Sequence, residues 1–266
     1  MPEPFLKWPG GKRWLAARVA AKIGPSRGRY YEPFLGGGAV FFELSSRPTT
    51  LADINSDLIN TYVHVRDNCD AVMAALKRLP VTKRKFYSIR AADPPNCLER
   101  AVRFLYLNRT CFGGMYRVNQ QGRFNVPYGG GERTPECLWT TNLLSDASAA
   151  LQGVELLCSD FEAVVNRAGE NDVVYCDPTY TVAHENNGFV RYNERNFGWA
   201  DQVRLARAAK RAAGRGALVL LSNAHHKSVR DLYPTARAER ISRLSLISPS
   251  VAARRSVSEY LFVVCL

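Results

Sequence analysis

Short apolar segments that end in a glycine-rich turn or an acidic residue alternate with helical patterns along this chain. The first predicted strand, residues 29–32, runs into a glycine-rich turn. A helix is predicted over residues 39–45, and the next strand, residues 50–52, ends at Asp53. A strand–helix–strand order implies parallel strands in an α/β sheet. In such sheets, ligands bind at the carboxyl ends of the strands.

The same alternation returns in the second half of the chain. Strands are predicted over residues 154–158, 172–176 and 217–221, a helix over 200–213, and a β pair over 238–243 and 259–265. We therefore expect a Rossmann-like, doubly wound α/β sheet.

Residues 58–151 have a different character. Helices are predicted over residues 60–79, 84–91 and 97–107, and residues 111–131 form a glycine-, arginine- and aromatic-rich hairpin or loop. We expect residues 1–57 and 152–266 to form one domain, with residues 58–151 as an inserted, mostly helical subdomain.

Composition narrows the class of protein. The 266 residues are 46% hydrophobic and carry a formal net charge of +12, which favours either a polyanionic partner such as nucleic acid or simply an arginine-rich surface. The seven cysteines are dispersed without zinc-ligand spacing, as expected of reduced thiols in a cytosol. No window reaches the roughly 18 apolar residues of a membrane span. We expect a cytoplasmic protein without a metal site.

The glycine-rich turn after the first strand predicts a ligand site. Gly36, Gly37 and Gly38 permit close approach of the backbone to a ligand, and Asp53 follows Glu32 by 21 positions. An acidic group at about this spacing suits a ribose hydroxyl. The spacing does not identify the nucleoside, and a tight turn with a helix cap is the structural alternative.

Two further segments bear functional side chains. In the run FLKWPGGK, Lys12 could hold a carboxylate, although the run could also be a basic turn. The sequence Asp177-Pro178-Thr179-Tyr180 directly follows an apolar strand. The Asp177 carboxylate and the Pro178 carbonyl could accept both hydrogens of an exocyclic amine while Tyr180 stacks on the ring. Without its context, this tetrapeptide would be a common turn.

Residues 109–128 combine arginines, amides and aromatic side chains. Arginines suit phosphates or guanine edges, Asn and Gln suit adenine edges, and aromatic rings can wedge between bases. An ordinary surface hairpin is the alternative.

Taken in this order, the segments FLKWPGGK, EPFLGGGAV, ADIN, RFNVPYG and DPTY resemble the Dam family (D12 class) of DNA adenine-N6 methyltransferases over nearly the whole chain. The resemblance implies transfer of a methyl group from S-adenosylmethionine to N6 of a flipped-out adenine in double-stranded DNA, within GATC if the family preference holds. It also implies a monomer and, in some systems, a cognate restriction endonuclease as functional partner.

The resemblance also implies roles for individual residues. The catalytic residues would be Asp177, Pro178 and Tyr180. The cofactor would be bound by Trp8, Lys12, Phe34, Gly36, Gly38, Asp53, Asp160, Phe161 and Asp177. DNA would be contacted by Lys7, Arg109, Tyr116, Arg117, Asn119 and Arg123.

One position departs from the family pattern, because Thr179 stands where the usual DPPY signature has its second proline. The hydrogen-bonding groups of the motif survive, but backbone stiffness worth about 0.4–1 kcal/mol is lost. A DNA-binding protein that has lost catalysis is therefore an alternative. Methylation of cytosine N4 uses the same direct chemistry, and charge alone does not exclude RNA. Another nucleotide-utilising enzyme is disfavoured, since the chain has neither GxGxxG nor a Walker motif.

Overall fold

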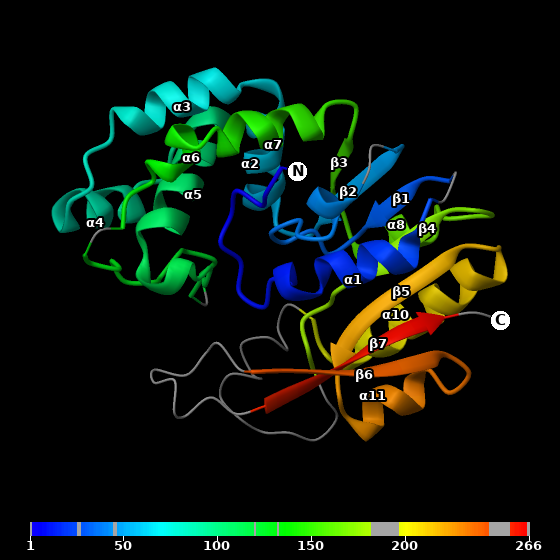
Figure 1. Ribbon diagram of the computed structural model, residues 1–266. Helices are drawn as coiled ribbons and strands as arrows, with labels where there is room; N and C mark the ends of the chain where they lie inside the picture. Colours follow the sequence, from blue (N-terminus) through cyan, green and yellow to red (C-terminus); the bar gives the residue numbers. More distant parts are fainter. Residues whose placement is uncertain are drawn as a thin grey trace. The chain divides into compact units, whose positions relative to one another are not determined.

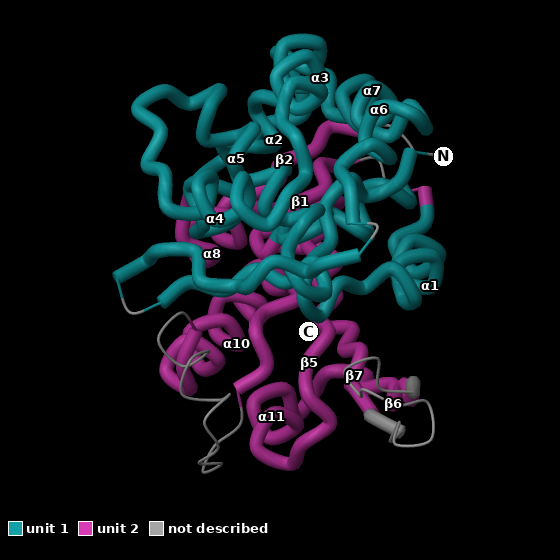
Figure 2. Tube along the Cα trace, turned by 90° about the vertical axis from the view of Figure 1, so that its left-hand side faces the viewer, with its two compact units in different colours: residues 1–24, 35–46, 53–158 teal, residues 25–34, 47–52, 159–266 magenta. Residues whose placement is uncertain are grey.

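A computed structural model describes residues 2–25, 28–44, 47–119, 121–131, 133–181, 197–244 and 256–264. The chain divides into two compact units (Figure 2). Unit 1 comprises Met1–Gly24, Leu35–Ser46 and Asp53–Cys158, and unit 2 comprises Pro25–Phe34, Arg47–Ala52 and Ser159–Leu266. The proposed insertion, residues 58–151, lies inside unit 1, and its status as a separate domain stays a prediction.

Unit 2 is built on a mixed β-sheet, which confirms the expected α/β class. The strands β2, β1, β4 and β5 are parallel, and β7 is antiparallel to both β5 and β6. In their order across the sheet they are β2 (Thr49–Asp53), β1 (Tyr30–Glu32), β4 (Val173–Cys176), β5 (Leu218–Ala224), β7 (Ser256–Val264) and β6 (Arg237–Leu244). A seventh strand, β3 (Glu155–Cys158), belongs to unit 1, as does Asp53 at the end of β2.

The centre of the sheet is apolar on both faces. All four residues of β4 are buried, as expected for a parallel strand with structure on both sides. The long helix α10 (Trp199–Gly214) buries a stripe at helical spacing that includes Leu205, Ala209 and Ala212. In unit 2 this helix packs against β5, β7, α8 (Phe161–Val165) and α11 (Lys227–Leu232) (Figure 1).

The strand order reverses between β1 and β4. These neighbours are in parallel register, with Tyr30 opposite Val173 and Tyr31 opposite Val174. From β1 the chain continues to β2 on one side, and from β4 it continues to β5 on the other. The carboxyl ends of β1 and β4 therefore form a topological switch point, the usual place for a ligand in a doubly wound sheet.

Unit 1 is mostly helical. Its central helix, α5 (Cys97–Thr110), buries every residue from Phe104 to Thr110 and packs against the second, third and fourth helices of the chain. The α-helices are α1 (Arg13–Ile23), α2 (Ser56–Asp67), α3 (Cys69–Lys77), α4 (Lys83–Ala91), α5 (Cys97–Thr110), α6 (Cys137–Thr140) and α7 (Leu143–Leu151), with short 3₁₀ turns η1 (Phe41–Glu43) and η2 (Phe112–Gly114).

Two predicted helices are corrected by the structure. The single helix expected over residues 60–79 is interrupted at Asn68, whose φ of −137° and ψ of 35° lie outside the helical range, so that α2 and α3 are separate helices. The helix expected over residues 39–45 is only the 3₁₀ turn η1, because Leu44 is already extended, with ψ of 146°. The other predicted strands and helices are found with ends shifted by a few residues, and residue 265 of the last predicted strand lies outside the described residues.

Within the described ranges, no helix is long and apolar enough to cross a membrane, and no group of three or more His, Cys, Asp or Glu residues could hold a metal ion. The six cysteines in those ranges form no disulfide.

Candidate functional site

The Asp177 carboxylate directly follows β4 at the switch point and is held by a buried relay. The hydroxyl of Ser222, on the neighbouring strand β5, donates to Oδ1 of Asp177 at 2.7 Å. The hydroxyl oxygen of Ser222 lies 3.1 Å from that of Tyr175. Ser222 has a single proton, so when that proton goes to Asp177, Tyr175 is the donor in the second bond. The relay fixes the direction of the carboxylate before any ligand arrives.

The side chain of Tyr180 is fixed at its far end. Its hydroxyl donates to Oε2 of Glu259 on β7 at 2.7 Å, and Glu259 is 2% exposed. Burial raises the pKa of Tyr180 well above its ordinary value, and the negative charges of Asp177 and Glu259 raise it further. The phenol is therefore neutral at physiological pH and can donate this hydrogen bond.

An aromatic cluster follows the carboxyl end of β1 in unit 2. The rings of Phe34 and Phe161 are stacked, with centroids 5.3 Å apart, and Phe197 contacts both. Asp160 caps α8 by accepting from the backbone N–H of Glu162 at 2.9 Å, and it pairs with Arg204 at 2.8 Å.

In unit 1, Asp53 braces the glycine-rich turn. Its carboxylate accepts from the backbone N–H of Gly36 and from that of Asn55, each at 3.0 Å. Gly36 and Gly38 have φ of 48° and 66°, and a Cβ on Gly36 would lie 2.7 Å from ring atoms of Trp8. A side chain at position 36 would therefore be strained and would collide with Trp8, which explains the glycine. Burial raises the pKa of Asp53, and hydrogen bonds from the backbone of Asn55, Gly36 and Ile54 partly offset this.

The N-terminal run of unit 1 places Trp8 and Lys12. Trp8 stacks on Tyr116 of the hairpin, with ring centroids 5.2 Å apart, and more distantly on Phe104. Lys12 is 5% exposed, and its ammonium group donates to the carbonyl of Gly10 at 3.1 Å.

The predicted hairpin is present around residues 111–128. Isolated bridges join Cys111 to Tyr128 and Val118 to Phe124. At its tip, Oδ1 of Asn119 accepts from the backbone N–H groups of residues 121 and 123, each at 3.0 Å, so this amide builds the turn. Arg117 is exposed and donates to Oδ1 of Asn125 at 2.8 Å, and Arg123 is exposed as well. Residue 120, within the predicted hairpin, lies outside the described residues.

Lys7 belongs to a group of like charges in unit 1. Its pKa is lowered by burial and by the positive charges of Arg109 and Arg133. Arg109 is 7% exposed and donates to the carbonyl of Phe5, so it anchors the N-terminal segment. Its contact with DNA stays a prediction. An anion beside Lys7 would relieve the repulsion within this group.

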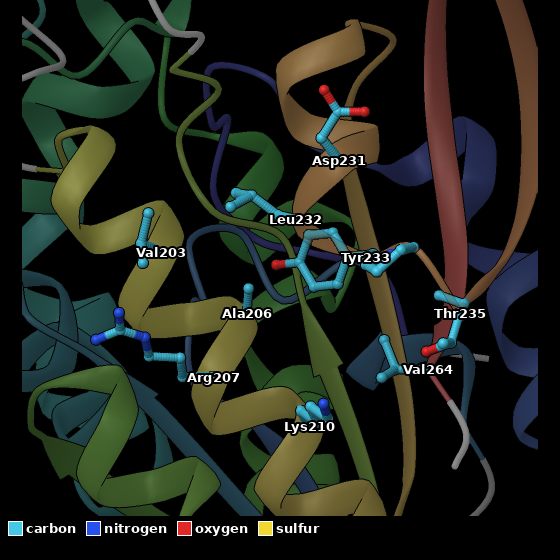
Figure 3. A pocket seen from close by; sticks show the side chains of 11 residues that line it. Val203, Ala206, Arg207, Lys210, Asp231, Leu232, Tyr233, Thr235 and Val264 are labelled. Carbon is cyan, nitrogen blue, oxygen red and sulfur yellow. The ribbon is translucent and has the colours of Figure 1, made fainter.

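A surface cavity of about 340 Å³ lies elsewhere in unit 2 (Figure 3). It is lined by α10, residues 231–236 and Val264. Val264 pairs with Val219 near the start of β5, whereas Asp177 follows the carboxyl end of β4. No predicted site residue lines the cavity.

Several groups at the site were given no role by the sequence. Ser222, Glu259 and Arg133 are common polar residues without a motif, and Ser222 stands out only because it directly follows an apolar strand. The position of Ser222 at the end of a predicted strand is the sequence feature that could have identified it as a site residue.

The chain is similar to known proteins over most of its length. A sequence profile of the D12 class N6 adenine-specific DNA methyltransferase family matches residues 8–247. The Type II methyltransferase M1.LlaDCHI of Lactococcus lactis subsp. cremoris is 32% identical, over 97% of this chain and 93% of the relative. The Type II methyltransferase M.MjaIII of Methanocaldococcus jannaschii is 34% identical, over 84% and 85%. A DNA adenine methylase of Haemophilus influenzae is 33% identical, over 98% and 93%.

Proposed function

The chain belongs to the D12 class of N6 adenine-specific DNA methyltransferases, and we propose that Asp177, Pro178 and Tyr180 are the residues with which it holds the target adenine. The enzyme transfers a methyl group from S-adenosylmethionine to N6 of adenine in DNA. The observation that carries the proposal is the double anchoring of the motif: Ser222 holds Asp177, and Glu259 holds Tyr180.

The roles follow from the chemistry of the groups. A base inside a duplex is out of reach, so the adenine is flipped out at a cost of a few kcal/mol and stacks on Tyr180. The Asp177 carboxylate and the Pro178 carbonyl accept the two N6–H groups, which directs the nitrogen lone pair away from them. As the nitrogen gains positive charge, its bond to the carboxylate strengthens, which stabilises the transition state.

The side chains proposed to bind S-adenosylmethionine match the chemical groups of this cofactor. When bound, S-adenosylmethionine supplies an electrophilic methyl group on a positively charged sulfur. We assign its carboxylate to the ammonium group of Lys12 and its ribose hydroxyls to the carboxylate of Asp53, an acceptor already oriented by two backbone N–H groups. Phe34 and Phe161 offer apolar faces for its adenine. The other proposed contacts are Trp8, Gly36, Gly38, Asp160 and Asp177.

DNA contacts are proposed for the hairpin and its surroundings. Arg117 and Arg123 are exposed beside the tip that Asn119 organises, as phosphate or base-edge contacts require. Lys7 lies among positive charges that a DNA phosphate would offset. Tyr116 and Arg109 complete the proposed set of DNA contacts. The ring of Tyr116 is held in place by its stack on Trp8.

Two relatives carry the name Type II methyltransferase, and on that basis we extend the proposal to a partner. A restriction endonuclease that cleaves the same sequence would be the functional counterpart of this enzyme, which would act on DNA as a monomer. Expression of the enzyme should then protect plasmid DNA from that endonuclease, and sedimentation should give the mass of one chain.

Calorimetry tests the cofactor assignment directly. The purified protein should bind S-adenosylmethionine in the presence of a chelator, and Asp53→Ala should weaken that binding by about 1–3 kcal/mol. DNA affinity should change less. Absence of binding at millimolar cofactor would refute the assignment, and equal losses for both ligands would make Asp53 a structural residue.

A further inference from the structure

The backbone on both sides of Tyr180 is held by one side chain of α10. Gln202 is 0% exposed, and its Nε2 donates to the carbonyl of Thr179 at 3.4 Å and to that of Thr181 at 3.3 Å. Its Oε1 accepts from Nδ2 of Asn223 at 2.8 Å.

The orientation of both amides is determined by their neighbours. Carbonyl oxygens only accept, so the nitrogen of Gln202 must face Thr179 and Thr181. Asn223, also 0% exposed, uses Oδ1 to accept from the backbone N–H of Ala224 at 2.8 Å, which turns its Nδ2 towards Gln202. Both N–H groups of the Gln202 amide and its oxygen therefore have hydrogen-bond partners. Buried hydrogen bonds of this kind favour one conformation of the segments that they join.

This contact falls where the chain departs from the family signature. Proline would lock φ at position 179 near −65°, and threonine does not. Thr179 is exposed, so its own side chain supplies no packing to replace the ring. Thr181 is fixed a second time, because its hydroxyl donates to the carbonyl of Phe197 at 2.7 Å.

We propose that Gln202, tied to Asn223, is a positioning residue for methyl transfer. Its amide holds the carbonyl groups of Thr179 and Thr181, the residues on either side of Tyr180, and thereby sets the plane of the ring on which the target adenine stacks. The inference rests on the proposed function of Tyr180. It implies that proline at position 179 and the amide of Gln202 perform overlapping tasks.

A double-mutant cycle tests this dependence. Methyl transfer is measured in single turnover at saturating duplex DNA and cofactor for wild type, Gln202→Met, Thr179→Pro and the double variant. Gln202→Met keeps the length of the side chain without its hydrogen bonds and should lower the rate by about 100-fold, as small misplacements of reacting groups do. The dissociation constant for S-adenosylmethionine should change by less than about threefold. Thr179→Pro should raise the rate at least about tenfold more in the Gln202→Met protein than in wild type.

The controls separate positioning from stability. Leu205→Ala removes a buried side chain of α10 that has no polar group, and its folded fraction should react at the wild-type rate. Gln202→Glu keeps the acceptor for Asn223 but faces two carbonyls with an acceptor, so it should be as slow as Gln202→Met. Any of three results would overturn the proposal. The rate of Gln202→Met could equal that of wild type, or Thr179→Pro could change the rate by the same factor in wild type and in Gln202→Met. The third is a loss of rate in Leu205→Ala as large as that in Gln202→Met.

Hydrogen exchange of the free protein gives a readout that needs no reaction. The peptide that contains residues 177–181 should exchange faster in Gln202→Met and in Gln202→Glu, and Thr179→Pro should slow it again. Unchanged exchange would refute the holding contact. Changed exchange in a protein that never methylates adenine would refute the proposed function and leave the contact intact.

Discussion

The hydroxyl of Tyr180 donates a 2.7 Å hydrogen bond to the buried carboxylate of Glu259, 79 residues later in the chain. Tyr180→Phe should keep the stacking face and lose only this bond. Methyl transfer should therefore slow by about 10-fold, which corresponds to the lower end of the free energies found for hydrogen bonds to charged groups. Tyr180→Ala should be far slower, because the stacking face is lost as well. Rates at saturating cofactor check this. Equal activity of the Phe and Ala variants would show that the ring does not hold the base.

The hydrogen bond from Ser222 to Asp177 gives a second prediction. Ser222→Ala leaves the carboxylate in place without its buried donor, so the single-turnover rate should fall by about 10-fold or more, while cofactor affinity changes little. Ser222→Thr retains the hydroxyl and should recover most of the rate. A large loss of cofactor affinity in Ser222→Ala would instead indicate a general disturbance of the sheet.

The raised pKa of Asp53 makes folding stability depend on pH with a defined sign. Between its ordinary value of 3.8 and the raised value, the folded protein binds more protons than the unfolded chain. The free energy of unfolding therefore decreases as pH rises through this interval and is constant above it. Asp53→Asn removes this contribution, so the variant should gain stability relative to wild type as pH increases, by about 1.4 kcal/mol for each unit by which the pKa is raised. Urea unfolding at several pH values measures the difference. If the stability of Asp53→Asn relative to wild type fell with increasing pH, the raised pKa of Asp53 would be contradicted.

The hairpin arginines should separate affinity from sequence preference. Arg117→Ala and Arg123→Ala should both weaken DNA binding, since both side chains are exposed on the hairpin. A lost phosphate contact should reduce the salt slope by about 1, and a lost base contact should reduce discrimination by about 1–3 kcal/mol. Binding to cognate and altered duplexes over a series of salt concentrations distinguishes the two. Lys210→Ala, an exposed cation of α10 at the cavity described above, is the matched control. If the hairpin variants behave like the control, the recognition role of the hairpin is wrong.

Sequence reasoning found the strand ends because local chemistry marks them. Asp53 and Asp177 each follow an apolar segment, and such segments become buried strands whose carboxyl ends meet at one edge. The break at Asn68 was missed, because the apolar periodicity runs through it and only the backbone angles show the interruption.

The residues that hold the motif could not be predicted in the same way. Ser222 lies 45 residues from Asp177, and the separation between Glu259 and Tyr180 is larger still. Contacts at such separations depend on strand order and register, which a pattern of apolar residues does not specify. For Arg109 the sequence predicts a role that the fold makes less direct. Its position in a motif favours contact with DNA, but the structure shows that its side chain is buried.

The most direct test is the transfer of tritium from labelled S-adenosylmethionine into duplex DNA by wild type and Asp177→Ala, with the modified base identified by mass spectrometry. Wild type should form N6-methyladenine, and sequencing of the methylated positions should give the recognition sequence. Asp177→Ala should remain folded, retain some DNA binding and lose about 10²–10³ in rate or more, since a preorganised group at the reacting nitrogen is removed. Methylation of cytosine N4, or N6-methyladenine formed by Asp177→Ala at the wild-type rate, would contradict the account.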